Sequence, residues 1–192
     1  MSSTLHATVK QLNDGLFHRI NSIAGKNKAL DILIIFVADW LMLFLVISPA
    51  VFLFQPTAHN LMIEMMLIYC ALVGFAFSRI TKLLVHYTRP ETHLQNVTTL
   101  VVSSNHLAFP SDHTAVAVAG ALGYFYFVNP LTGLVLFVVA LVIGISRIAA
   151  GVHYPLDVAA STLLGIATST VLYLLSPQII HATLYLFGRI VS

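Results

Sequence analysis

Residues 30–54 read LDILIIFVADWLMLFLVISPAVFLF, an apolar run that only Asp31, Asp39 and Pro49 interrupt. A helix needs about 20 mostly apolar residues to cross the hydrocarbon core of a bilayer, so this run predicts a membrane span. Four more apolar runs follow it, at about 61–80, 114–128, 131–145 and 156–175. The sequence therefore predicts an all-α, polytopic membrane bundle with five transmembrane helices, or six if residues 176–192 also cross.

The composition of the whole chain agrees with a lipid environment. Of 192 residues, 58% are apolar and only 8% are charged, whereas soluble domains carry about a quarter charged residues. This composition excludes a soluble enzyme, a nucleic-acid-binding protein and a disordered chain. The net charge of +2 is too small to indicate a polyanionic partner. The single cysteine, Cys70, excludes an internal disulfide and a multi-cysteine metal site.

The residues before the first span have a different pattern. Apolar residues recur there at helical spacing beside charged ones, which predicts an amphipathic helix at the membrane interface; they are Leu5, Leu12, Leu16, Ile20 and Ile23. We expect one integral-membrane domain over 1–192, with an interfacial segment at 1–29, a transmembrane core at 30–175 and a C-terminal helix at 176–192.

The alternation of spans predicts that three polar segments share one membrane face. These segments are residues 82–113, the end of the fourth span at Arg147, and the turn at 151–157. Charged groups at bilayer depth are costly, so they normally pair with one another or bind something. We therefore expect their ionisable side chains to form one layer: Lys82, Arg89, His113, Arg147, His153 and Asp157.

The cations of this layer favour an anion site. Lys82, Arg89 and Arg147 supply three positive charges, and a guanidinium group suits bidentate contact with phosphate. Ser111 stands where a helix N-cap should stand, and Pro155 suits a first helical turn. Two helix N-termini would then open toward the layer, each adding free N–H donors and a partial positive charge. Phosphate is the natural ligand of such a site.

The histidines of the layer predict the reaction. His153 and Asp157 are four residues apart, so the carboxylate can hold one ring nitrogen and leave the other as a base or nucleophile. His113 is available to protonate a leaving oxygen. Together they describe phosphoryl transfer through a phosphohistidine, in which arginine and lysine take the charge-stabilising role of a metal ion. We expect no metal and no cofactor.

Each residue alone also has a structural interpretation. Lys82 and Arg89 could anchor a span end, and Arg147 could form a structural ion pair with Asp157. His153 alone is more often a hydrogen-bonded interfacial histidine, and Ser111 alone is a helix cap. The agreement of three segments favours the site. Five further residues have open roles, as cross-bundle contacts, a polar path or loop groups near the pocket: Asp39, Glu64, His86, His93 and His106.

Three motifs in order resemble the type-2 phosphatidic acid phosphatase superfamily: K-x6-R-P at 82–90, P-S-D-H at 110–113 and S-R-x5-H-x3-D at 146–157. The resemblance implies a bundle of about six membrane helices. It implies that His153 attacks phosphorus, Asp157 orients it and His113 protonates the leaving group. It also implies that the phosphate is held by Lys82, Arg89, Ser111, Arg147 and the backbone N–H of Asp112.

One position departs from the common family pattern. Asp112 stands where glycine is usual, and a carboxylate beside an anion site is unfavourable unless it points away or pairs with a base. The variant FPSDHT is similar to the bacterial undecaprenyl-diphosphatases associated with bacitracin resistance. This similarity implies hydrolysis of undecaprenyl diphosphate, with phosphatidylglycerophosphate or phosphatidate as alternative substrates. A transport or ion-conducting protein is the alternative from another class.

The expected partners are membrane lipids and a polyprenyl diphosphate or phospholipid phosphate substrate, without nucleic acid. Nothing in the sequence indicates a particular oligomeric state. The resemblance implies a bacterial inner-membrane protein whose site faces the extracytoplasmic side. The positive-inside rule favours the opposite orientation, because several basic residues precede the first span on the same face as the site: Lys10, Arg19, Lys26 and Lys28.

Overall fold

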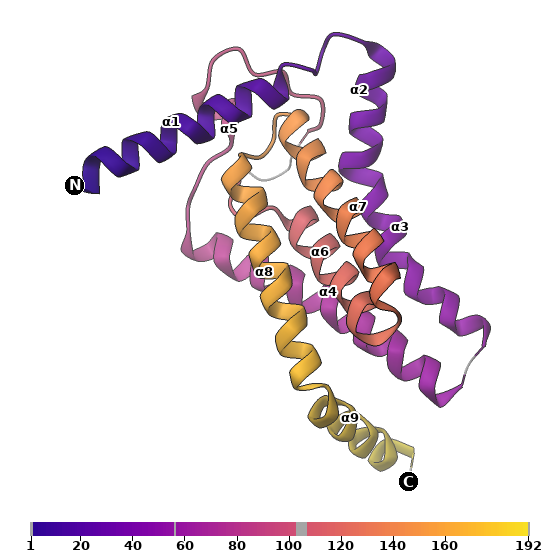
Figure 1. Ribbon diagram of the computed structural model, residues 1–192. Coiled ribbons are helices and arrows are strands. Elements are labelled where there is room, and N and C mark those ends of the chain that lie inside the picture. Colours follow the sequence, from indigo (N-terminus) through magenta and orange to yellow (C-terminus); the bar gives the residue numbers. More distant parts are fainter. Residues whose placement is uncertain (1, 56, 103–106, 192) are drawn as a thin grey trace.

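The computed structural model describes residues 2–55, 57–102 and 107–191, which are almost entirely helical (Figure 1). In this part of the chain, the only β-pairing is an isolated bridge between Thr88 and Leu107. The elements are α1 (Ser2–Asn21), α2 (Lys28–Ile35), η1 (Phe36–Trp40), α3 (Leu41–Ile47), η2 (Ser48–Phe54), α4 (Ala58–Leu84), α5 (Pro90–His93), α6 (Asp112–Phe127), α7 (Pro130–Ala149), α8 (Pro155–Leu174) and α9 (Ser176–Val191).

Four helical runs are long and apolar enough to cross a membrane: Lys28–Phe52, Ala58–Leu84, Pro130–Ala149 and Pro155–Leu174. The predicted all-α membrane bundle is confirmed, and the chain is a multi-pass membrane protein. The third predicted span, at 114–128, is α6, which has 16 residues. At about 1.5 Å per residue it is shorter than the hydrocarbon core, and the four longer runs surround it.

Helix α6 lies at the centre because its side chains are small. It contacts α3, α4, α7 and α8, and its buried positions are mainly alanine, glycine and valine. Small residues let helix backbones approach closely inside a membrane. At Gly120 the approach is so close that a Cβ atom would lie 2.5 Å from a methyl group of Leu45. The sequence of α6 thus explains why the other helices pack around it.

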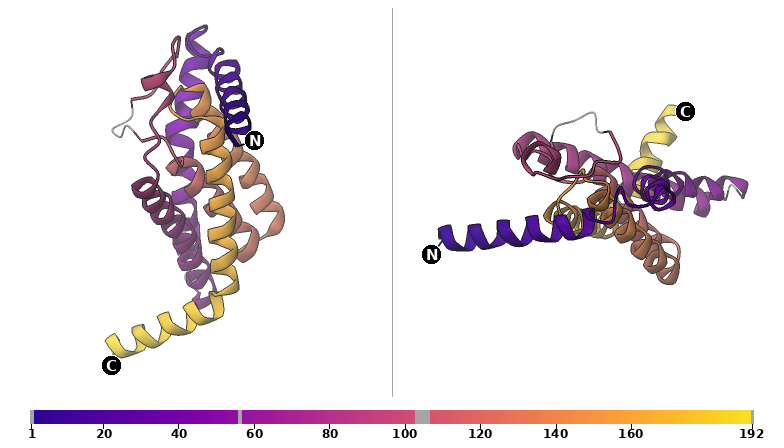
Figure 2. Two further views of the ribbon diagram at one scale, coloured as in Figure 1. Left: turned by 90° about the vertical axis from the view of Figure 1, so that its left-hand side faces the viewer. Right: turned by 90° about the horizontal axis from the view of Figure 1, so that it is seen from above.

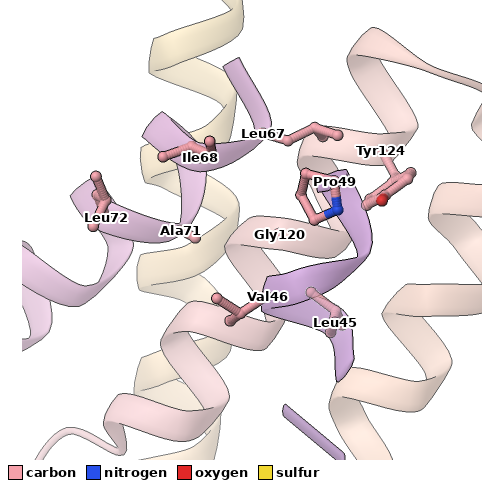
Figure 3. Close-up of a pocket in the computed structure, with 9 residues that line it drawn as sticks. All are labelled: Leu45, Val46, Pro49, Leu67, Ile68, Ala71, Leu72, Gly120 and Tyr124. Carbon is pink, nitrogen blue, oxygen red and sulfur yellow. The ribbon is translucent and has the colours of Figure 1, made fainter. Parts of the chain in front are cut away.

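A small apolar cavity lies beside this crossing, between α3, α4 and α6 (Figure 3). Its volume is about 80 Å³, and its walls include Leu45, Leu67 and Tyr124. Charged residues do not line it. The cavity is therefore an apolar crevice between helices, partly lined by exposed residues and separate from the polar layer predicted from the sequence.

Replacing Gly133 by alanine is expected to destabilise the bundle, because α7 touches the backbone of α6 there. A Cβ atom at Gly133 would lie 2.3 Å from the N and Cα atoms of Phe125, so one helix must move. Overpacking of this kind costs about 1–3 kcal/mol. Thermal unfolding in detergent measures the effect, with Gly15→Ala as the control because nothing lies within 4 Å of that position. Equal unfolding temperatures for Gly133→Ala and the wild type would contradict this close crossing.

The two terminal helices lie outside the parallel part of the bundle (Figures 1 and 2). Helix α1 crosses one end of the bundle, and its apolar residues Leu5, Leu12 and Leu16 remain exposed. It is held by buried Phe17 and by polar residues that bond to the bundle. Helix α9 turns away from α8 at the other end. It has 16 residues and, like α6, is not among the four runs that are long and apolar enough to cross a membrane.

Candidate active site

The ends of several helices meet at the end of the bundle that α1 crosses (Figure 1). Five segments reach this region: the last turn of α4, the loop that follows it, the first turn of α6, the end of α7 and the start of α8. The structure brings together the side chains that the sequence analysis selected. Six of them are almost fully buried: Lys82, Arg89, Ser111, Arg147, His153 and Asp157. Asp112 and His113 are partly exposed.

His153 and Asp157 form the pair that their spacing predicts. The Nδ1 atom of His153 lies 3.4 Å from Oδ2 of Asp157, and the same oxygen accepts a hydrogen bond of 2.8 Å from the backbone N–H of Tyr154. Oδ1 of Asp157 is buried without a hydrogen-bond partner among the described residues. Because Nδ1 is engaged, Nε2 is the ring nitrogen left for chemistry.

The electrostatic environment of His153 shows that the cations converge on it. Its pKa is held well below the ordinary value, first by burial and then by the positive charges of Arg147, Arg89 and Lys82. Both effects oppose a charged imidazolium. His153 is therefore neutral near pH 7, the protonation state in which an imidazole can act as a nucleophile.

Arg89 connects the first polar segment to the turn that carries His153. Its Nη1 donates a 2.8 Å hydrogen bond to the carbonyl of Val152, the residue immediately before the histidine. Gly151 makes this turn possible, because it has φ +84° and a Cβ atom there would lie 2.5 Å from the carbonyl oxygen of Thr98. The backbone at the turn is thus fixed from both sides.

Arg147 pairs with Asp39 of the first membrane run, and not with Asp157 as the structural interpretation proposed. Its Nη1 donates to Oδ1 of Asp39 in a short ion pair and lies 3.4 Å from the carbonyl oxygen of Ala38. The Nε atom of Arg147 is buried with no hydrogen-bond partner in the described part of the chain. Asp39 therefore makes the cross-bundle contact that was one of its open interpretations.

Asp112 pairs with a base, the arrangement that makes a carboxylate acceptable beside an anion site. Its Oδ2 lies 2.7 Å from Nζ of Lys82 and 3.3 Å from Nε of Arg79. Its Oδ1 accepts a 2.5 Å hydrogen bond from the hydroxyl of Ser78. The side chain of Asp112 thus ties the start of α6 to the last turns of α4.

Ser111 occupies the N-cap position of α6, but its side chain makes no capping hydrogen bond. Its hydroxyl instead accepts a 3.1 Å bond from Thr114, and its backbone N–H donates a 2.7 Å bond to the hydroxyl of Ser161. Ser161 in turn donates to the carbonyl of Asp157. Pro155 occupies the first turn of α8 as the sequence predicts. These bonds join the second and third motifs.

Several residues that support the site were missed from the sequence. Ser161 lies four positions after Asp157 on the same helical face, a spacing that could have revealed it. Asn13 accepts a 3.0 Å bond from the backbone N–H of Leu156 at the start of α8. The amide of Asn21 donates to the carbonyl oxygens of Thr98 and Ala149. Polar residues of α1 therefore hold both ends of the turn between α7 and α8, which carries His153.

Among the described residues, the remaining candidates form no hydrogen bond or ion pair with Lys82, Arg89 or Arg147, although His93 lines a cavity together with Tyr154 and Asp157. His86 and His93 are exposed, and His93 contacts the hydroxyl of Thr88. Glu64 lies near the opposite end of α4, and His106 is outside the described residues. In the described part of the chain, no group of three or more His, Cys, Asp or Glu side chains could hold a metal ion.

Comparison with known proteins agrees with the fold and the motifs. Residues 63–180 match the model of the PAP2 superfamily. The chain belongs to this superfamily, and the resemblance drawn from the three motifs is confirmed. Membership supports a phosphatase of membrane lipids.

Two curated relatives and two solved structures are similar to the chain. It is 31% identical to the bacitracin transport permease protein BcrC of Bacillus licheniformis, over 94% of the chain and 89% of that protein. It is 30% identical to the undecaprenyl-diphosphatase BcrC of Bacillus subtilis strain 168, over 81% of the chain and 79% of that protein.

The solved structures share the fold. LpxE of Aquifex aeolicus has a TM-score of 0.68 and 28% identity, covering 83% of this chain and 93% of that one. A PAP2-type phosphatidylglycerolphosphate phosphatase of Bacillus subtilis has a TM-score of 0.67 and 18% identity, covering 90% and 88%.

Proposed function

We propose that this protein hydrolyses undecaprenyl diphosphate to undecaprenyl phosphate and inorganic phosphate. The observation that carries the proposal is the convergence of Lys82, Arg89 and Arg147 on a neutral, buried His153. The Bacillus subtilis relative named as an undecaprenyl-diphosphatase supports the substrate, as does the FPSDHT sequence.

In the proposed first step, Nε2 of His153 attacks the outer phosphorus of the diphosphate. The bond from that phosphorus to the bridging oxygen breaks, and undecaprenyl phosphate leaves with its oxygen protonated by His113. Asp157 holds the other ring nitrogen of His153 and stabilises the positive charge that develops on the ring. The product of this step is a phosphohistidine at residue 153.

The phosphate oxygens need positive partners throughout the reaction. Arg89, Arg147 and Lys82 supply them, together with the backbone N–H of Asp112 at the start of α6. The unpartnered Nε of Arg147 is a donor that a phosphate oxygen would satisfy. In the second step, water attacks the phosphohistidine while His113 accepts its proton, and inorganic phosphate is released. We propose that the reaction proceeds without a metal ion.

We also propose a single domain over 1–192 in a bacterial inner membrane, with the site on the extracytoplasmic face. Undecaprenyl diphosphate released on that face would then reach the site from the lipid. A transport function is the alternative, because the Bacillus licheniformis relative is described as a transport permease. An ion path needs ionisable groups along the spans, whereas most of those in the described residues crowd at one end of the bundle.

A direct test compares initial rates of phosphate release by the purified protein in detergent. Undecaprenyl diphosphate, phosphatidate and phosphatidylglycerophosphate are assayed in parallel, each with and without EDTA. We expect the highest kcat/KM for undecaprenyl diphosphate and no loss of rate with EDTA. A higher kcat/KM for either phospholipid would overturn the substrate, and inactivation by EDTA would overturn the metal-free reaction.

Replacing Asp112 by asparagine is expected to strengthen anion binding at this site. The substitution removes the negative charge that pairs with Lys82, while the amide oxygen of asparagine can still accept the hydrogen bond from Ser78. A unit charge about 8 Å away at an effective dielectric of about 20 contributes about 2 kcal/mol. Partial exposure reduces this figure, so we expect orthovanadate to bind about tenfold more tightly.

Calorimetry of orthovanadate binding in detergent measures this change. Glu64→Gln is the matched control, since it also replaces a carboxylate by an amide, but near the other end of α4 and far from the cations. This variant should bind orthovanadate like the wild type. Unchanged or weaker binding by Asp112→Asn would show that the carboxylate does not offset the charge of the site.

A further inference from the structure

The first membrane run contains a π-helical turn, η1 (Phe36–Trp40), between α2 and α3. The backbone N–H of Leu41 bonds there to the carbonyl of Phe36, five residues earlier. A π turn adds one residue to a helical turn, so the side chains around it leave the register of an α-helix. Turns of this kind are frequently found at functional sites. Asp39 lies within this one.

The turn directs Asp39 toward the polar end of two other helices. One carboxylate oxygen, Oδ1, pairs with Nη1 of Arg147 on α7 and lies 3.9 Å from Nε2 of His113 on α6. The side chain of Asp39 is 37% exposed, that of His113 is 28% exposed and that of Arg147 is 5% exposed. Asp39 therefore joins a cation of the site to the histidine expected to protonate the leaving group.

The contact with Arg147 fixes the orientation of the guanidinium group. Asp39 and the carbonyl of Ala38 engage Nη1, while Nε has no partner among the described residues. A guanidinium group held at one edge by a carboxylate presents its other edge to a second anion. Asp39 thus leaves Arg147 ready for phosphate without competing for every donor.

The contact with His113 concerns its protonation. Burial is the largest effect that opposes an imidazolium at this ring, and the charges of Arg147, Lys82 and Arg89 also oppose it. Asp112, the preceding residue, favours the charged form, but Lys82, Ser78 and Arg79 already engage its carboxylate. Oδ1 of Asp39 lies 3.9 Å from Nε2 of His113, and a nearby carboxylate favours the charged form of a histidine.

We propose that Asp39 is a positioning residue, which orients Arg147 for the phosphate and favours protonation of His113, the group that donates the proton. The proposal rests on the phosphatase function proposed above. During the reaction the Nε2 proton of His113 moves to the leaving oxygen as the P–O bond breaks.

The test compares wild type, Asp39→Asn and Asp39→Glu in detergent with two phosphate monoesters. Phosphatidate has an alkoxide leaving group that needs a proton, whereas 4-nitrophenyl phosphate has a leaving group that departs without one. We expect Asp39→Asn to lower kcat for phosphatidate at least tenfold, and for 4-nitrophenyl phosphate less than threefold. Its KM should not rise, because removing a negative charge does not weaken anion binding.

The pH–rate profile gives a second readout. Loss of the carboxylate makes the imidazolium less stable, so the alkaline limb of kcat for phosphatidate should move to lower pH in Asp39→Asn. Asp39→Glu should restore the limb toward its wild-type position. Asp31→Asn, which neutralises an acid of the same helical run whose partner is the N–H of Gly25, is the control and should keep the wild-type profile.

An equal loss on both monoesters, with an unmoved alkaline limb, would overturn the action of Asp39 on His113, and wild-type behaviour of Asp39→Asn would overturn its role altogether. The wild-type protein reports separately on phosphatase activity in the same assay. Phosphate release by the wild type, together with a failed prediction for Asp39→Asn, would leave the phosphatase standing and remove only this residue from its mechanism.

Discussion

Replacing His153 by asparagine should reduce phosphate release from undecaprenyl diphosphate by a factor of about 10⁴ or more. The loss of a nucleophile in enzymes that form covalent intermediates has effects of this order. Asparagine is close in size to part of the imidazole ring and keeps a polar group near Asp157, but it cannot form the phosphoenzyme. Initial rates of phosphate release measure the loss, and thermal unfolding verifies that the variant is folded.

His86→Asn is the matched control for this experiment. His86 lies in the loop after α4 and is exposed, so the same chemical change there should leave the rate within about twofold of the wild type. If His153→Asn kept more than about a tenth of the wild-type rate, another group would have to attack phosphorus.

Replacing Arg147 by lysine has the second-largest expected effect, a loss of about 10²–10³ in kcat/KM. Lysine keeps the positive charge but lacks the planar fork that allows two anions to bind at different edges. Its single ammonium group would pair with Asp39 and leave no donor in the place of the unpartnered Nε. Steady-state kinetics with undecaprenyl diphosphate measure this loss.

Arg19→Lys on the exposed side of α1 provides the control, because it makes the same substitution at a residue that does not reach the cations. Retention of kcat/KM within about fivefold in Arg147→Lys would show that charge alone suffices at this position. The geometry of the guanidinium group would then have no part in the reaction.

The bundle could be predicted because the amino-acid composition of a segment is enough to identify it as a membrane span. The apolar runs located the helices, and Asn129, Pro130 and Pro155 marked where two of them begin. The short, central α6 was harder to predict, since its apolar run is shorter than the roughly 20 residues that a span needs. Its place at the centre depends on which helices pack closely around it.

The site could be predicted as far as its residues are spaced regularly along helices. The His153–Asp157 contact follows from a separation of four residues, and the shared end of the bundle follows from the alternation of spans. The partner of Arg147 could not be found in this way. A π turn moves Asp39 out of the 3.6-residue register on which pattern analysis depends.

The role of α1 shows a second limit of pattern analysis. Its leucines predicted an interfacial helix, a pattern that assigns no contacts to its polar side chains. Asn13 and Asn21 instead turn inward and bond to backbone groups at the start of α8 and the end of α7. Hydrophobic spacing cannot reveal such contacts, because a buried amide is stable only when the tertiary fold supplies its partners.

The covalent role of His153 is the central claim, and the stereochemistry at phosphorus tests it most directly. The substrate is an undecaprenyl diphosphate whose outer phosphoryl group is a chiral thiophosphate labelled with oxygen-18, hydrolysed in oxygen-17 water. Each in-line displacement inverts phosphorus, so two successive displacements through a phosphohistidine restore the original configuration. Net retention in the released thiophosphate is the expected result. Net inversion would mean that water attacks the substrate directly, and it would contradict the account.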